Sequence, residues 1–328
     1  MNITIIIGNG FDKNLGLNTS YKDFYKNYYI KQKTDNPIIE KMREEIRNYS
    51  NGNEKGKEIE NWGDAEKEFG IFSNKCETSK QYVDCYENLH SELIKYLNTI
   101  VINGKEEFAV QLFNSIENIS KKFRINQQDV IKIYFINLNY TNIIEKEIDK
   151  LKEFCKNNNS IQIVDSIKLH GDLYNEPIFG VADIGQVINK KIRDNLTTSF
   201  VKQIVKINCD ELLVKNKNYV RARTVIDNSN GIYSFGWSFG DTDNILLRYI
   251  AQSVRKNRKF IFYSHNFVLR NLERKSYEED LFNNFHNDFL KEKLKHFGGN
   301  NIEMGYINNN IISECHSPFD NLTNFYKV

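Results

Sequence analysis

The chain opens on Asn2-Ile3-Thr4-Ile5-Ile6-Ile7-Gly8-Asn9-Gly10-Phe11-Asp12, the stretch that decides the fold class. Four of the five residues from 3 to 7 are isoleucine, without the regular polar alternation of a half-exposed strand. Such a run predicts a β-strand buried on both faces, as in a parallel sheet that is covered by helices. The glycine pair that follows at once predicts a tight turn at the end of this strand.

Strand and helix signals alternate again after residue 128. Helical spacing of apolar residues dominates between residues 21 and 123, so we expect a large helical insertion after the first strand. The alternation predicts an α/β fold with a doubly wound, mostly parallel, Rossmann-like sheet. Strands are predicted at 130–138, 161–169, 177–181, 231–235 and 259–263, and helices at 143–155 and 243–254.

Three parts are expected along the chain. Residues 1–20 and 129–265 form a Rossmann-like nucleotide-binding core, and residues 21–128 form the helical insertion. Residues 266–328 are assigned to a C-terminal helical region, in which the Asn-rich tail after residue 300 has no clear pattern.

The composition excludes several classes of protein. The chain has 45 basic and 43 acidic residues, and this near balance gives no electrostatic reason to expect a nucleic-acid binder. Its five cysteines form no C-x-x-C pair, so neither a disulfide framework nor a metal site is expected. We find no signal peptide and no apolar run of about 18 residues, and therefore expect a cytoplasmic protein with no membrane partner.

Unusual residues follow four of the predicted strands, and ligands of open α/β sheets bind outside the carboxyl ends of strands. After the first strand, Gly8 and Gly10 would let backbone amides approach a phosphate at a helix N-terminus. The G-x-G-x-x-G pattern is incomplete, because position 13 is lysine. The alternative is a tight turn with Asp12 as a helix cap. The candidate ligand contacts of this segment are Gly8, Asn9, Gly10, Phe11 and Asp12.

The next two strand ends carry an asparagine and a histidine. Asn139, followed by Tyr140, could hold ribose hydroxyls or position a water, or could simply cap the helix that begins near Thr141. His170, followed by Gly171, could polarise a hydroxyl or act as a base near neutral pH, or could be packed in a turn. We take Asn139 and His170 as the candidate catalytic pair.

The fourth strand end and one helical motif complete the candidates. Gly236 and Ser238 could accept a ribose or a phosphate, and Asp243 could join them or cap the following helix. The motif Asn61-Trp62-Gly63-Asp64-Ala65-Glu66 holds two carboxyl groups that do not share a helix face. A core role is the alternative for Trp62.

These segments, in this order, resemble the AbiH family of bacteriophage abortive infection proteins. The matching pieces are IIIGNGFD, GLNTSYKDF, ENWGDAE, INLNYTNIIE, KLHGDLYNEPIFG and YSFGWSFGDTD, which extend from residue 3 to about residue 245. The resemblance implies a role in anti-phage defence. It leaves open a phage-derived trigger and self-association as partners beside a small nucleotide.

The AbiH family is in turn distantly similar to the sirtuin-like superfamily, which implies NAD as substrate or ligand. Carried over, Gly8 and Gly10 face the NAD phosphates, while Gly236 and Ser238 lie near the adenosine ribose. Asn139 orients the nicotinamide ribose or a water, and His170 contacts a ribose hydroxyl as a base.

Two departures from the sirtuin pattern change the expected reaction. The aspartate expected two residues after the asparagine is Thr141, and the zinc-binding cysteines are absent. A protein deacylase is therefore not implied. Cleavage of the nicotinamide–ribose bond through an oxocarbenium-like state fits better, and it needs no metal.

The leading hypothesis is thus an NAD glycohydrolase. A nucleotide-binding sensor without turnover is the first alternative, and Thr141 favours it. A nucleic-acid-directed toxin or nuclease is the second, and the near-neutral charge weighs against it.

Overall fold

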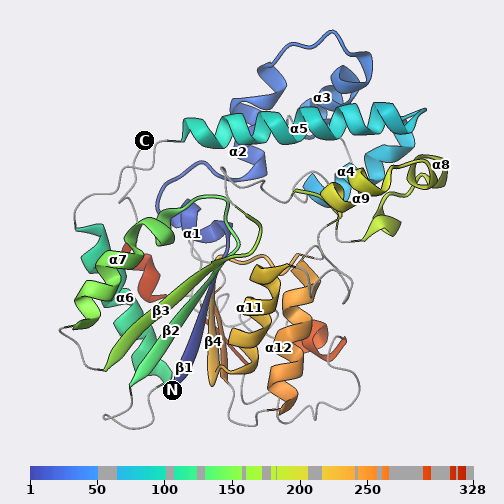
Figure 1. Ribbon diagram of the computed structural model, residues 1–328. Helices are drawn as coiled ribbons and strands as arrows, with labels where there is room; N and C mark the ends of the chain where they lie inside the picture. The colour runs from blue at the N-terminus through green and yellow to red at the C-terminus, as the bar shows by residue number, and fades with distance from the viewer. Residues whose placement is uncertain are drawn as a thin grey trace, which may run out of the picture.

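A parallel β-sheet forms the centre of the molecule in the computed structural model (Figure 1). The structure describes residues 1–50, 65–100, 107–123, 130–156, 160–171, 179–181, 183–205, 216–240, 243–256, 261–265, 291–296, 311–314 and 317–322.

The sheet has six strands in the order β3-β2-β1-β4-β5-β6, and every neighbouring pair is parallel. The predicted α/β class and the parallel sheet are therefore confirmed. The strands are β1 (Asn2–Ile7), β2 (Ile131–Asn137), β3 (Ile161–Lys168), β4 (Gly231–Phe235), β5 (Ile261–His265) and β6 (Ile311–Glu314).

The isoleucine run makes β1 an inner strand that is buried on both faces. Ile3, Ile5 and Ile7 belong to a core shared with α6 (Phe108–Phe123) and α7 (Ile143–Lys156). Ile6 faces the opposite core, which it shares with two other helices. These are α11 (Lys217–Asp227) and α12 (Asn244–Lys256), which lie across the sheet from α6 and α7 in Figure 1. Helices on both faces remove the need for polar alternation, which explains why four of the five residues from 3 to 7 are isoleucine.

One segment packs in a different place from the one expected, and another has a different secondary structure. Helix α6 falls inside the range 21–128, yet its apolar side packs on the sheet in the same core as β1. Residues 311–314, assigned by sequence to a helical region, form β6 beside β5. The β-branched pair Ile311-Ile312 suits a strand, but the asparagines before it conceal that signal.

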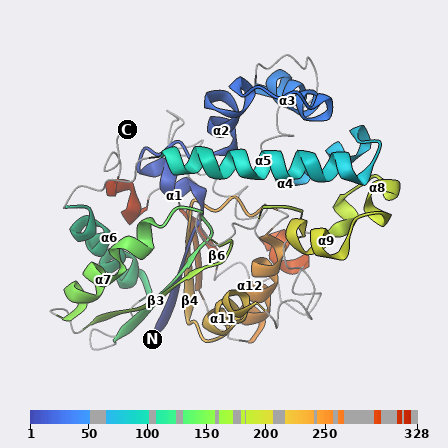
Figure 2. The same ribbon diagram turned by 45° about the horizontal axis from the view of Figure 1, so that its top comes forward.

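A second layer of helices lies over the carboxyl edge of the sheet, above α1 (Asn9–Asn14) in Figures 1 and 2. Its members share one aromatic-rich core. Two separate parts of the chain build it, because α8 and α9 come from the connection between β3 and β4. The layer contains α2 (Tyr21–Asn27), η1 (Tyr29–Lys31), α3 (Pro37–Ser50), α4 (Ala65–Phe72), η3 (Ser73–Lys75), α5 (Ser79–Thr99), η4 (Ile184–Gln186), α8 (Lys190–Asp194) and α9 (Thr198–Ile204).

The strand expected at 177–181 is reduced to one residue in the described part of the chain. Val181 forms an isolated parallel bridge with Val205, and residues 177 and 178 lie outside the described residues. Glycine is required beside this bridge, since Gly180 has φ +157° and an added Cβ would lie 1.9 Å from the Ile204 carbonyl oxygen. Among the described residues, no helix is both long and apolar enough to cross a membrane.

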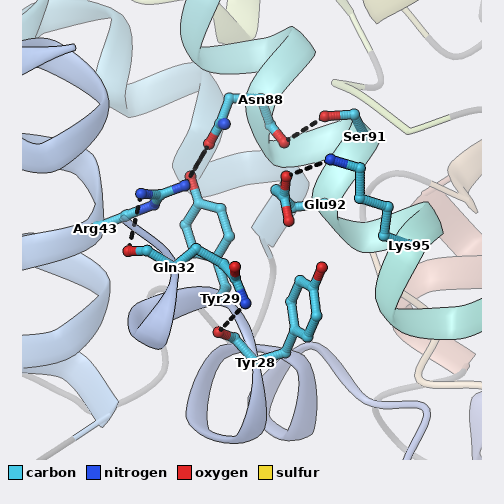
Figure 3. Close-up of polar contacts among 8 residues, drawn as sticks. All are labelled: Tyr28, Tyr29, Gln32, Arg43, Asn88, Ser91, Glu92 and Lys95. Carbon is cyan, nitrogen blue, oxygen red and sulfur yellow. Dashed lines mark hydrogen bonds and ion pairs between the residues drawn. The ribbon is translucent and has the colours of Figure 1, made fainter. Parts of the chain in front are cut away.

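A buried arginine joins three helices of the upper layer (Figure 3). The Arg43 guanidinium donates to the Gln32 carbonyl at 3.0 Å and to Asn88 Oδ1 at 3.3 Å. It also lies 5.0 Å from the centre of the Tyr29 ring, a cation–π distance. Burial raises the pKa of the Tyr29 hydroxyl, which donates to Asn88 Oδ1 at 3.0 Å. Arg43 thus fixes α3, η1 and α5 to one another.

Replacing Arg43 by methionine should destabilise the protein by about 2–3 kcal/mol, because buried acceptors lose a charged donor. Arg47→Met is the matched control on the same helix. The Arg47 side chain is 39% exposed and pairs with Glu40 at 3.4 Å, so its loss should cost less than about 1 kcal/mol. Urea unfolding of the two variants measures the difference, and equal losses would show that Arg43 is not a specific clamp.

Candidate functional site

The turns after β1 and β4 cross in direct backbone contact. A Cβ added to Gly8 would lie 2.6 Å from the Gly236 carbonyl oxygen, and one added to Gly10 would lie 2.4 Å from the Gly236 Cα. Gly236 itself has φ +68°, a conformation that favours glycine. These three glycines are therefore required for two turns to pack on each other.

Hydrogen bonds across this crossing use backbone donors of the first turn. The Gly8 amide donates to the Phe235 carbonyl at 3.0 Å, and the Gly10 amide donates to the Gly236 carbonyl at 2.9 Å. The Phe11 amide donates to the Gly8 carbonyl at 2.9 Å. The backbone amides of Gly8 and Gly10, which the sequence analysis assigned to a phosphate, therefore donate their hydrogen bonds to carbonyl groups of the protein.

Phe11 and Asn9 point in opposite directions from this turn. The Phe11 ring is fully buried and makes edge contacts with Phe235 and Phe319. Its side chain is part of the core, so only its backbone could contact a ligand. Asn9 is exposed, and its side-chain oxygen accepts a hydrogen bond from the Thr19 hydroxyl at 2.5 Å.

Asp12 joins the end of β1 to the end of β2. Its side chain is 1% exposed and does not cap α1, which has no side-chain cap. Asn139 Nδ2 donates to Asp12 Oδ1 at 3.0 Å, and the Thr141 hydroxyl donates to Oδ2 at 2.8 Å. The carboxylate therefore fixes the orientation of the candidate catalytic asparagine.

A supporting network that the sequence analysis missed holds the loop after β2. Lys168 Nζ donates to the Asn139 carbonyl at 2.7 Å and also to the Thr141 carbonyl. Asn137 Oδ1 accepts from the Asn139 amide at 2.9 Å, while its Nδ2 donates to Glu145 at 3.0 Å. Lys168 lies two residues before His170, but its role depends on contacts with the loop after the neighbouring strand β2, which sequence spacing does not show.

Burial makes Asp12 titrate near neutrality. Loss of hydration raises the pKa of Asp12 from its ordinary value of 3.8 to about 7. The hydrogen bond from Thr141, the positive charge of Lys168 and the hydrogen bond from Asn139 lower the pKa in opposition. A buried carboxyl group with such a pKa at a strand end is a candidate for proton transfer near pH 7.

His170 pairs with Asp243 across the sheet edge. His170 Nε2 lies 3.2 Å from Asp243 Oδ1, and Trp237 Nε1 donates to Asp243 Oδ2 at 3.0 Å. His170 follows β3 and Asp243 follows β4, yet β2 and β1 separate these strands. Three strand spacings amount to about 14 Å, and His170 is only two residues beyond β3, so the longer segment between β4 and Asp243 has to cover most of this distance.

The remaining candidates lie at the same edge. Gly171 has φ +73°, which lets the chain turn directly after the histidine. Ser238 is exposed, and Tyr140 is half-buried against the aromatic core of the upper layer. Glu66 belongs to that layer and is buried, while Trp62 and Asp64 lie outside the described residues. In the described ranges, no group of three or more His, Cys, Asp or Glu residues could hold a metal ion.

Gly10→Ala should destabilise the protein by about 2 kcal/mol, because the new methyl group meets the backbone of Gly236. Helix propensity alone predicts the opposite sign, since alanine usually stabilises a helix by about 0.5–1 kcal/mol relative to glycine. Gly185→Ala is the control, because its Cβ would meet only the exposed Asp183 side chain. Urea unfolding measures the stability of both variants. A Gly10→Ala protein as stable as the wild type would show that the turns after β1 and β4 do not pack as closely as described.

Asp12→Asn should remove the part of the pH dependence of the free energy of unfolding that arises from the Asp12 carboxyl group. The unfolded chain releases this proton near pH 4, whereas the folded protein holds it to about pH 7. The unfolded state therefore binds fewer protons in this window, and the free energy of unfolding falls as pH rises. The difference between a pKa of 3.8 and one of about 7 corresponds to about 4 kcal/mol. Asp12→Asn should lack most of this decline between pH 4 and pH 8.

The control for this measurement is Asp149→Asn on the exposed face of α7. It should retain the wild-type pH profile of urea unfolding. Parallel profiles for wild type and Asp12→Asn would show that the Asp12 carboxyl does not titrate as described.

Comparison with known proteins gives one family. A comparison with curated proteins finds no match for the chain. The family model described as "Bacteriophage abortive infection AbiH" matches residues 4–265, which include all four strand ends of the candidate site. With most of its length matched, the chain belongs to the AbiH family of bacteriophage abortive infection proteins.

Proposed function

We propose that this AbiH protein binds NAD at the carboxyl edge of its sheet and hydrolyses the nicotinamide–ribose bond, thereby depleting NAD in an infected cell. The strand order supports the proposal, because β3-β2-β1-β4-β5-β6 is the order of doubly wound dinucleotide-binding sheets. Dinucleotides bind such sheets where the order reverses, here between β1 and β4. We regard the part of the upper layer that follows β1 as an insertion into this Rossmann-like plan.

One observation carries the proposal: polar groups that follow four strands pair with one another at this edge, in two sets that are largely withdrawn from solvent. Asp12 binds residues of the loop after β2, and His170 reaches Asp243 across the ends of β2 and β1. Buried polar groups are costly, so a protein that concentrates them at a strand edge usually uses them there.

The hydrogen bond between Asn139 and Asp12 and the close contact between His170 and Asp243 support distinct roles. His170 Nε2 lies 3.2 Å from Asp243 Oδ1, and in the proposed reaction Nδ1, the other ring nitrogen, accepts the hydrogen bond of a ribose hydroxyl. Asn139 holds the ribose or a water, oriented by Asp12. The carboxylate that the sirtuin resemblance expects at position 141 is supplied by Asp12, which lies 2.8 Å from the Thr141 hydroxyl.

The reaction requires only water as a second reactant. The bond between ribose C1′ and the nicotinamide nitrogen breaks, and its electron pair neutralises the ring nitrogen. The oxygen of water bonds to C1′, and its proton passes to a base of the site. The products are nicotinamide, ADP-ribose and a proton. Preorganised polar groups stabilise the oxocarbenium-like state in a site of this kind.

The diphosphate needs donors other than the first-turn amides, which bond within the protein. The side chains of Asn9 and Ser238 are exposed on the two crossing turns and are suited to this role. The helical layer above the edge is where a phage-derived trigger or a second copy of the chain would control access.

A sensor that binds the nucleotide without turnover is the second candidate. Thr141 favours it, because a threonine hydroxyl that donates to Asp12 cannot serve as the base that an aspartate would provide. This candidate predicts binding of NAD or ADP-ribose without nicotinamide release.

His170→Ala should lower nicotinamide release from millimolar NAD at least about 100-fold, the usual contribution of a positioned base. Chromatography of the reaction mixture measures the release, and calorimetry measures binding of NAD by the same proteins. His296→Ala is the control, because this histidine is exposed. It should release nicotinamide at the wild-type rate.

The other outcomes separate the candidates. Equal release by wild type and His170→Ala would remove His170 from the mechanism. Binding without release would favour the sensor, and absence of both would reject a nucleotide site at this edge.

A further inference from the structure

One residue of the loop after β4 has a backbone conformation that side chains rarely adopt. Phe239 has φ +55°, and among the residues that the structure describes it is the only non-glycine with a positive φ. This left-handed region is unfavourable for a side chain, because its Cβ approaches the following carbonyl oxygen. Glycine would adopt the same conformation without strain, as Gly236 does in this loop. The surroundings of Phe239 must therefore hold it in place.

Two contacts hold Phe239, one through its ring and one through its backbone. The ring is 1% exposed, and its centroid lies 4.4 Å from that of Trp237. Lys293 Nζ donates to the Phe239 carbonyl at 2.7 Å. Lys293 is half-buried, and a hydrogen bond from a charged donor is stronger than one from a neutral donor. Both contacts resist rotation of the backbone out of the left-handed region.

The ammonium group comes from a part of the chain that the proposed reaction does not use. Lys293 lies in the helical residues 291–296, beyond the residues 4–265 that the family model matches. Leu294, next to it, is fully buried in the core that contains Trp237 and Phe239. Leu294 therefore anchors this segment in the core, and Lys293 ties it to the loop.

The loop leads by successive contacts to His170. Phe239 packs on Trp237, and Trp237 Nε1 donates to Asp243 Oδ2 at 3.0 Å. The other oxygen of that carboxyl group, Oδ1, lies 3.2 Å from His170 Nε2. The Asp243 amide donates to the carbonyl of Gly240, the residue after Phe239, at 3.0 Å. Both the side chain and the backbone of Asp243 thus depend on the conformation of this loop.

We propose that Lys293 is a positioning residue that, through the Phe239 carbonyl, keeps the loop after β4 in the conformation that turns Asp243 toward His170. This inference rests on the proposed function, because it concerns the histidine that serves there as a base. A loop that only connected β4 to α12 could use glycine at position 239 and would need no clamp. Backbone strain of this kind is typical of sites where a functional side chain is held in place.

The test observes the His170 imidazole directly, by heteronuclear NMR of its ring nitrogens. His170→Ala identifies the His170 signals among those of the six histidines. Lys293→Met should shift these signals, because the loop relaxes and Asp243 moves relative to the ring. In turnover, Lys293→Met should lower kcat about 10-fold with little change in KM for NAD, since a small misplacement of a reacting group is costly.

Two further variants test the route by which Lys293 acts. Lys293→Arg should retain the wild-type signals and most of the rate, because a guanidinium group is also a charged donor. Trp237→Phe removes the donor to Asp243, which lies later in the same series of contacts. It should shift the same signals. Added to Lys293→Met, it should cause little further loss of kcat, because the two changes then act through one series of contacts.

Lys295→Met is the matched control, since Lys295 is exposed in the same helical segment. It should leave the His170 signals and the rate unchanged. Near-ultraviolet circular dichroism checks that every variant is folded. Lys293→Gln is a milder second variant, whose shorter neutral side chain cannot replace the ammonium group, and it should shift the same signals as Lys293→Met.

The outcomes separate this inference from the proposed function. Wild-type His170 signals in both Lys293→Met and Lys293→Gln would overturn the inference, even in a protein that cleaves NAD. Shifted signals with an unchanged kcat would overturn the role of Lys293 in the reaction. A wild type that releases no nicotinamide rejects the hydrolysis, and the NMR signals alone then decide whether Lys293 holds Asp243 toward His170.

Discussion

The contact of two backbone turns at Gly8, Gly10 and Gly236 is the constraint on which the rest of the structure depends. No side chain can stand between these turns, because any Cβ would lie within 2.6 Å of the opposite backbone. The amides of Gly8 and Gly10 add hydrogen bonds across the contact. It fixes where β1 and β4 end relative to each other, and with them the start of α1 and the loop that leads to Asp243. The glycines thus shape the site by packing.

Beside this rigid contact, the protein buries ionisable side chains. Asp12 and His170 are both nearly inaccessible, and burial of a carboxylate is unfavourable unless other groups compensate. The hydroxyl of Thr141, the amide of Asn139 and the nearby Lys168 compensate only in part, since the pKa of Asp12 stays at about 7. A protein stabilised only for rigidity would replace this carboxyl group by a neutral one. Its presence at the edge where parallel sheets bind ligands is therefore best explained by chemistry or recognition.

The helical layer gives this edge its cover and a second set of polar groups. Two distant parts of the chain form it, and aromatic contacts together with Arg43 hold it as one body. Tyr140, next to the residues that hold Asp12, packs against its aromatic core. Any movement of the layer would therefore be transmitted to the loop after β2.

The sequence by itself determined the parallel sheet, most strand positions and the strand ends that carry the candidate residues. These follow from local periodicity, as in the run of Ile3 to Ile7, and local periodicity is readable along the chain. It did not reveal β6, the pairing of His170 with Asp243, or the use of Asp12 as a partner of Asn139. It also did not reveal that the glycine pair packs against Gly236. Only the tertiary structure decided these points, because each depends on a residue more than 70 positions away or on a strand that pairs through the sheet, and no periodicity records which distant segment comes near.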